Sequence, residues 1–129
     1  MALSREHRLR GRFVFDRIYQ KGRRIHGQWM VLRTMRAEPQ LLKVDPRDQS
    51  PLSCRLGVVV SSKVSKRSVQ RNRLRRLLHG HLSRQLPEIP THGEGLWLLI
   101  SLKPGSADAE ERLLLGECCE LIAKAGLRP

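Results

Sequence analysis

The chain has 129 residues, 40% of them hydrophobic, which suits one globular domain built around a single core. Its formal net charge of +13 costs self-repulsion in a compact chain, so it indicates a polyanionic partner: RNA, DNA or an anionic membrane. No apolar run approaches the roughly 18 residues of a membrane span, and the N-terminal residues lack the apolar core of a secretory signal. We therefore expect a cytoplasmic protein.

The N-terminal third contains a short helix and then a strand. Phe15, Ile18 and Tyr19 recur at helical spacing and predict a helix over about 12–20, with Gly22 just past its end. The run WMVLRTMR at 29–36 is rich in large apolar residues and predicts a strand. The polar, proline-bracketed segment 37–51 predicts a flexible loop insertion.

The remaining elements alternate between strand and helix. The run RLGVVVS at 55–61 predicts a buried strand, and the basic segment after it opens a helix that reaches about residue 85. LWLLISL at 96–102 predicts the next strand, and a last helix starts near Ser106 with acidic residues in its first turn. The order predicts an α+β sandwich in which helices pack on a small sheet.

The segment from Lys63 to Arg76 concentrates positive charge without any acidic residue between Asp48 and Glu88. On a helical wheel its leucines form one side, which docks on the sheet, and Asn72, Arg76 and His79 lie on the other. A solvated charged face is the simpler interpretation, but like charges at this spacing destabilise a helix unless a partner neutralises them. The segment therefore favours nucleic-acid binding, because an arginine fork donates two parallel hydrogen bonds to a phosphate.

Asn72 stands between two arginines and has several possible roles. Its amide can bond a base edge, a 2′-hydroxyl or a neighbouring arginine, or it can cap the start of the helix.

Neither cysteines nor histidines form a metal-binding pattern. Cys118 and Cys119 are adjacent and Cys54 is distant, which fits buried thiols in a reducing compartment. His79 and His81 lie two residues apart and cannot chelate together on a helix. We expect no metal site built by the protein alone and no catalytic residues in it.

The segment RLGVVVSSKVSKRSVQRNRLRRLL resembles the signature of the bacterial ribonuclease P protein component family, in which a G-[LV]-x-V-[SA] strand precedes R-N-R-x-[KR]-R at a helix start. The first helix and the late strand LLISLKPG are similar to those of the family as well. The resemblance covers most of the chain outside 37–51. It implies a single domain over 1–129 with a ferredoxin-like, ribosomal S5 domain 2-like α-β-β-β-α-β-α sandwich and a left-handed βαβ crossover.

The resemblance also implies a function and partners. The chain is expected to be the RNA-binding protein subunit of ribonuclease P, a bacterial-type cytoplasmic endoribonuclease that removes the 5′ leader from precursor tRNA. Its partners would be the catalytic RNA and the leader, and Mg²⁺ would be bound mainly by the RNA subunit. Neither DNA nor membrane is expected.

The expected site residues fall into two groups. The RNA-binding group is Lys63, Lys66, Arg67, Arg71, Asn72, Arg73, Arg75, Arg76 and His79. The leader-binding group, in a cleft between the first helix and the sheet, is Phe15, Tyr19, Met30 and Arg33. The strand departs from the family at the last two: an aromatic frequent in relatives is Met30, and a tyrosine common near the strand's end is Arg33.

The residues leave three alternatives open. Phe15 is either a cleft residue or a core residue. A ribosomal or other structural RNA-binding protein would share the charge and the small α+β architecture. A helix-in-groove DNA binder is disfavoured because the residues before Ser68 read as strand and not as a helix-turn-helix.

Overall fold

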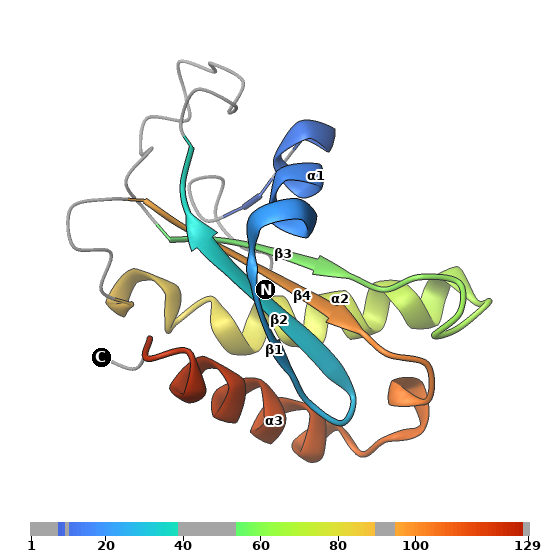
Figure 1. Ribbon diagram of the computed structural model, residues 1–129. Helices are drawn as coiled ribbons and strands as arrows, with labels where there is room; N and C mark the ends of the chain where they lie inside the picture. Colours follow the sequence, from blue (N-terminus) through green and yellow to red (C-terminus); the bar gives the residue numbers. More distant parts are fainter. Residues whose placement is uncertain (1–7, 10, 39–53, 90–94, 128–129) are drawn as a thin grey trace.

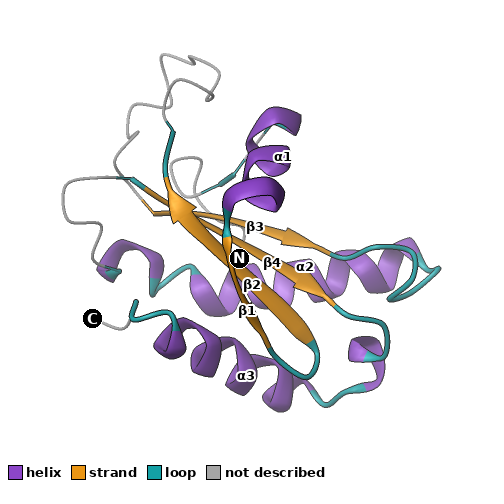
Figure 2. Ribbon diagram, in the orientation of Figure 1, coloured by secondary structure: helices purple, strands orange, loops and turns teal. Residues whose placement is uncertain are grey.

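The computed structural model describes residues 8–9, 11–38, 54–89 and 95–127. Within these ranges, three α-helices and four strands make two helical layers on a mixed sheet, in which α1 lies on one face and α2 and α3 lie side by side on the other (Figures 1 and 2). The α+β fold expected from the sequence is therefore confirmed. In the described part of the chain, no helix is long and apolar enough to cross a membrane.

The sheet has the order β1-β2-β4-β3. Strand β2 (Met30–Arg36) pairs antiparallel with both β1 (Arg23–His26) and β4 (Leu96–Leu102), and β4 pairs in parallel with β3 (Cys54–Val59). Between the two parallel strands the chain forms α2 (Ser68–Leu82), which makes a βαβ unit. The left-handed crossover implied by the family resemblance stays a prediction.

The helices bury their apolar stripes on opposite faces of the sheet. Helix α1 (Arg12–Lys21) contributes Val14 and Ile18 to a small core with Trp97 and Leu99. Helices α2 and α3 (Glu111–Lys124) cover a larger core on the other face, to which α2 contributes Leu74, Leu78 and Leu82. Because every second residue of a strand faces the same side, β4 serves both cores.

Several element boundaries differ from the sequence prediction. Strand β1 was not predicted from the residues, because RRIH has one half-buried side chain, Ile25, and lies at the edge of the sheet. Helix α2 ends at Leu82, and a short 3₁₀ turn containing Pro87 follows it at Leu86–Glu88. Another 3₁₀ turn at Ser106–Asp108 precedes α3, which begins five residues later than predicted. Of the predicted loop 37–51, all but Ala37 and Glu38 lies outside the described residues.

Candidate nucleic-acid interface

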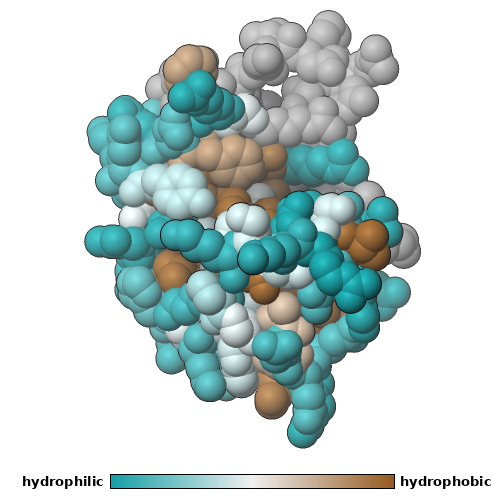
Figure 3. All heavy atoms as spheres, turned by 90° about the vertical axis from the view of Figure 1, so that its right-hand side faces the viewer, coloured by the Kyte–Doolittle hydropathy of each residue, from teal (hydrophilic) through white to brown (hydrophobic). Residues whose placement is uncertain are grey.

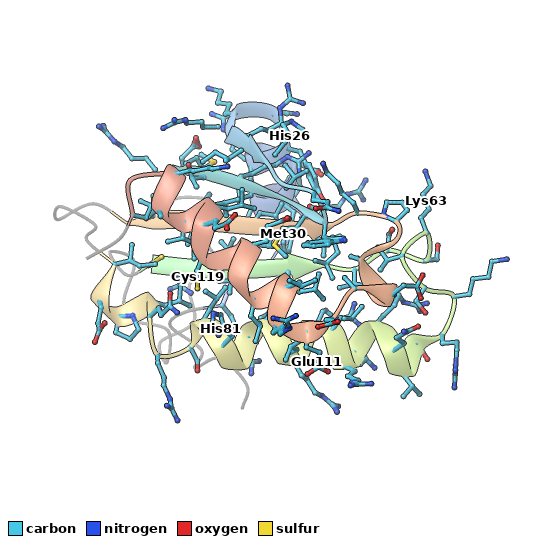
Figure 4. All side chains as sticks on the ribbon, turned by 90° about the horizontal axis from the view of Figure 1, so that it is seen from below. His26, Met30, Lys63, His81, Glu111 and Cys119 are labelled. Atoms are coloured by element: carbon cyan, nitrogen blue, oxygen red, sulfur yellow. The ribbon has the colours of Figure 1, made fainter. Side chains whose placement is uncertain are left out.

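The cationic run of the sequence forms one continuous surface, which we call the α2 surface. It comprises the loop that joins β3 to α2 and the side of α2 that faces away from the sheet (Figure 4). Its members are Lys63, Lys66, Arg67, Arg71, Asn72, Arg73, Arg75, Arg76 and His79, and all of them are exposed or half-buried. The structure therefore brings together the nine residues that were expected to bind RNA.

The amide of Asn72 holds a neighbouring arginine. Its Oδ1 accepts a hydrogen bond from Nη2 of Arg75, one turn along the exposed side of α2. The helix begins at Ser68, with Arg67 at the N-cap and no side-chain cap bond. Asn72 is therefore not a helix cap, and of the roles open to it the structure shows the arginine contact.

Arg71 has a structural contact at the start of the same helix. Its Nη1 donates a hydrogen bond of 2.8 Å to the carbonyl oxygen of Ser65, which fixes the loop against the first turn of α2. The hydroxyl of Ser65 donates to the side chain of Gln70 at 2.6 Å. These bonds orient the loop that carries Lys66 and Arg67.

One carboxylate from a distant part of the chain reaches the α2 surface. Nη2 of Arg73 lies 2.6 Å from Oε1 of Glu111, at the start of α3, and both side chains are exposed (Figure 4 labels Glu111). Among the described residues this is the only ion pair of the run. Local sequence contains no acid near Arg73, so only the packing of α3 beside α2 provides this partner.

His79 lies at the edge of the α2 surface and is half-buried. Burial lowers the pKa of this imidazole below its ordinary 6.5, and the positive charges of Arg8 and Arg75 lower it further. The neutral form is favoured by all three effects, so near neutral pH His79 adds a polar group and not a full charge to this surface.

The opposite face of the sheet carries a second candidate surface, which we call the α1 surface. It comprises Phe15, Tyr19, Arg33 and Ser101, where α1 meets β2 and β4. Figure 3, which views the side where α1 lies above the strands, shows exposed apolar atoms between hydrophilic ones.

Phe15 and Tyr19 lie one helical turn apart but differ in burial. Phe15 is half-buried and packs against the smaller core, where a Cβ at Gly57 would come within 2.8 Å of its ring. The glycine of the family motif thus makes room for this ring. Tyr19 is 45% exposed, and its hydroxyl lies 3.5 Å from Oγ of Ser101. Tyr19 is therefore open to a ligand, and Phe15 is largely a packing residue with one accessible part.

Arg33 lies under the end of α1 and contacts Tyr19. Its guanidinium carbon is 4.6 Å from the centroid of the Tyr19 ring, and its Nη1 donates a hydrogen bond of 3.2 Å to Oγ of Ser101. Ser101 was not among the predicted site residues. The only signal available for it was the strand assignment of LLISL, and the register that places it beside Tyr19 is not readable from the sequence.

The prediction that Met30 faces the same cleft as Arg33 is wrong. Met30 is 0% exposed and belongs to the larger core, which lies between the sheet and helices α2 and α3. Residues separated by an odd number of positions on a regular strand face opposite sides of the sheet. Since Arg33 faces α1, Met30 faces away from it.

The expectation of buried thiols holds for Cys54 and Cys118 but not for Cys119. Burial raises the pKa of Cys54 and of Cys118 to about 12. Cys119 is half-buried, and its Sγ lies 3.2 Å from Nε2 of His81 between α2 and α3 (Figure 4). Within the described ranges, no three His, Cys, Asp or Glu side chains lie close enough together to hold a metal ion.

A family model and the curated relatives both match nearly the whole length of the chain. A family model described as Ribonuclease P matches residues 3–126. A ribonuclease P protein component from Parasynechococcus marenigrum (strain WH8102) is 52% identical over 129 residues and is covered to 98%, as is this chain. That from Synechococcus sp. (strain WH7803) is 49% identical, with both chains covered completely.

Solved structures of more distant proteins have the same fold. The RNase P protein of Staphylococcus aureus superimposes with a TM-score of 0.75 at 18% identity, covering 95% of this chain and 98% of that one. The RNase P protein of Thermotoga maritima gives a TM-score of 0.68 at 20% identity, covering 91% and 96%.

Proposed function

This chain belongs to the ribonuclease P protein family, and we propose that its α2 surface binds the RNA subunit of that enzyme while its α1 surface holds the 5′ leader of precursor tRNA. As a member of the family it is the protein component of the endoribonuclease that matures the 5′ ends of tRNAs. Its partners are the ribonuclease P RNA and precursor tRNA.

The observation that carries the proposal is the unneutralised charge of the α2 surface. Arg76 is exposed and has no ion pair in the described part of the chain, and Arg75 is oriented by Asn72. The run contains seven cations, and among the described residues they have one carboxylate partner, Glu111. Guanidinium groups along one side of a helix can each pair with a phosphate, and phosphate contacts supply a large share of the affinity of protein–nucleic acid interfaces.

The α1 surface has the composition of a site for single-stranded RNA. An exposed aromatic ring offers a stacking platform that accepts any base, and a nearby arginine attracts the backbone. Tyr19 and Arg33 provide one of each within contact distance. A leader held there would distinguish precursor from mature tRNA, because only the precursor has nucleotides on the 5′ side of the cleavage site.

The chemistry of cleavage belongs, in this proposal, to the RNA subunit. That subunit would bind most of the Mg²⁺, and the bound ions would supply the Lewis-acid chemistry that phosphodiester cleavage requires. The protein would contribute by binding the RNA and the leader and by lowering the Mg²⁺ concentration that the assembly requires. The enzyme would act in the bacterial cytoplasm.

Reconstitution tests this proposal directly. The purified protein is added to ribonuclease P RNA and precursor tRNA at a Mg²⁺ concentration too low for the RNA alone. We expect leader removal with both components and none with either alone. Unchanged cleavage on addition of the protein would contradict the proposal. Activity of the RNA-free protein that disappears with a point substitution in this chain would contradict the assignment of the chemistry to the RNA.

A further inference from the structure

Arg33 is held on the α1 surface by neutral groups only. The ring of Tyr19 lies 4.6 Å from its guanidinium carbon, and the hydroxyl of Ser101 accepts a bond from Nη1. No carboxylate of the described residues pairs with Arg33, although acidic partners do pair with Arg17 and Arg73. Its Nε is buried and has no hydrogen-bond partner among them.

This arrangement leaves a positive charge uncompensated in a partly desolvated position. Withdrawing a charge from water costs free energy unless an opposite charge or several hydrogen bonds replace the water. Arg24, directly opposite Arg33 in the β1–β2 register, adds a second cation on the same face of the sheet. The local field therefore favours an anion beside Arg33.

The geometry also limits what Tyr19 can do. One side of its ring is in contact with the guanidinium group, so a base can stack only on the remaining exposed part. Arg33 is both a cation–π partner and a planar donor. Ser101 accepts from one N–H of Nη1, so the second N–H of Nη1 and both of Nη2 have no hydrogen-bond partner among the described residues and can donate to a ligand. A fork of this kind, oriented on two sides, matches the oxygens of a phosphodiester.

We propose that Arg33 binds a phosphodiester group of the 5′ leader and that Tyr19 and Ser101 are positioning residues that orient its guanidinium. This inference rests on the proposed function and specifies how the α1 surface holds its ligand. Recognition at this point would be of backbone charge and not of a base, so it would tolerate any nucleotide and weaken with salt.

The test replaces single phosphates of the leader. A series of precursor tRNAs is made with one uncharged methylphosphonate at each leader position in turn, and each is bound to the assembled enzyme. At one position we expect the methylphosphonate to weaken binding roughly tenfold, as for a lost charged hydrogen bond. With Arg33→Gln the same loss should occur for every precursor, and the methylphosphonate at that position should then add little.

Control variants separate charge, orientation and folding. Arg23→Gln removes an equal charge from the neighbouring β1 but from the opposite face of the sheet, and should leave the profile of methylphosphonate effects unchanged. Ser101→Ala preserves the charge of Arg33 but removes a group that orients it, so the loss of affinity caused by the methylphosphonate at the sensitive position should become smaller. Arg33→Lys should recover part of the affinity, since it keeps the charge but loses the fork. Thermal melts of all variants show whether folding is intact.

Two further ligands identify the source of the phosphate. Mature tRNA and the RNA subunit alone should bind the Arg33→Gln variant as tightly as the unaltered protein. For precursor tRNA, the slope of log affinity against log salt should fall by about 0.7 when Arg33 is replaced, the value for one phosphate of a single strand. A loss confined to the RNA subunit would assign Arg33 to that partner and overturn the proposal.

The outcomes that would overturn the inference differ from those that would overturn the function. A second series of precursors has one abasic nucleotide at each leader position in turn. If the effect of an abasic nucleotide depends on Arg33 and the effect of no methylphosphonate does, the site recognises a base. If Arg33→Gln lowers the melting temperature and weakens all ligands equally, Arg33 is a structural residue. Both results can occur while the reconstituted enzyme is fully active at low Mg²⁺, so they leave the proposed function intact.

Discussion

At the residue scale, aromatic side chains that look equivalent in the sequence have different roles in the structure. Phe15 packs against Gly57 and the smaller core, whereas Tyr19 is 45% exposed beside Arg33. Phe15 is therefore mainly a core residue, whereas Tyr19 is accessible from the cleft. Side-chain burial, and not helical spacing, decides between them.

Alanine substitution should separate these roles. Tyr19→Ala should weaken precursor tRNA binding by about five- to a hundredfold, because stacking is worth roughly 1–3 kcal/mol per base, with little change for mature tRNA or for the melting temperature. Phe15→Ala should destabilise the fold by up to about 3 kcal/mol, because it removes packed ring atoms. Affinities for both tRNAs and thermal melts check this. Equal losses for both tRNAs in the Tyr19 variant would show that Tyr19 acts through the fold.

The lowered pKa of His79 predicts a dependence of stability on pH. In the unfolded chain the imidazole of His79 has its ordinary pKa of 6.5, whereas in the folded protein its pKa is lower. The free energy of unfolding should therefore fall as pH drops through 6.5 and level off below the folded-state pKa. His79→Gln should reduce this dependence in urea titrations at several pH values. The same pH dependence in both proteins would contradict the shift.

At the element scale, α2 is stabilised by packing more than by its own sequence. It has no acid in its first turn and no side-chain cap, and its three buried leucines face the larger core. The exposed side is consequently free to carry like charges that a partner neutralises. This separation of a packing side from a charged side suits α2 to an RNA interface.

Removal of two arginines from α2 should change the salt dependence of RNA binding. In Arg73→Ala/Arg76→Ala the slope of log affinity against log salt should fall by up to about two units, since each contact with a helical RNA contributes about one. Both side chains are exposed or half-buried, so the melting temperature should stay nearly constant. Arg112→Ala is the matched control, because this exposed arginine pairs with a carboxylate as Arg73 does but lies on α3, outside the α2 surface. An unchanged slope in the double variant would exclude α2 as the RNA-binding element.

The β1–β2 turn depends on a buried acid from α3. The carboxylate of Glu117 accepts hydrogen bonds from the backbone amides of Gln28, Trp29 and Met30 at 2.9, 2.8 and 3.1 Å. Glu117 is 9% exposed, and a Cβ at Gly27 would lie 2.3 Å from its Oε1. This contact joins the last helix to the edge of the sheet.

Glu117→Gln should therefore destabilise the protein. The amide group would turn a donor toward backbone donors and leave a buried N–H unsatisfied, at a cost of about 1–3 kcal/mol. Denaturant unfolding measures this, with Glu120→Gln on the exposed side of α3 as control. Equal stability of the two variants would show that the three amides do not depend on the carboxylate.

At the scale of the whole molecule, one thin sheet separates the two candidate surfaces. The α2 surface and the α1 surface lie on opposite faces, each over its own hydrophobic core (Figures 1 and 2). Such an arrangement allows two RNA segments to be bound at once without competition. It also lets β4, which contributes to both cores, serve as the common support.

Substitutions on the two faces should act independently. In the assembled enzyme, the free-energy losses of precursor binding for Tyr19→Ala and Arg76→Ala should add within about 0.5 kcal/mol, because distant sites with no shared partners do not couple. Binding measurements on the unaltered protein, both single variants and the double variant complete this double-mutant cycle. A coupling energy well above that value would show that the two surfaces bind a common segment of RNA.

The family, the charge and the elements with strong local periodicity could be predicted from the amino-acid sequence. The bounds of β4 were predicted to the residue, Gly22 was correctly placed just past α1, and the polar side of α2 was read from a helical wheel. These features depend on residues close together along the chain, where a period of two or 3.6 is sufficient.

Tertiary structure alone decided which residues meet across the sheet and between helices. The edge strand β1, the inward orientation of Met30, the Arg73–Glu111 pair and the contact of Tyr19 with Arg33 all depend on register and on helix placement. A shift of one residue in a strand would exchange its two faces, and no local pattern specifies which of several apolar residues faces which core. Charge and periodicity can therefore be predicted from the sequence, whereas the pairing of distant side chains depends on how the helices and strands pack in the folded protein.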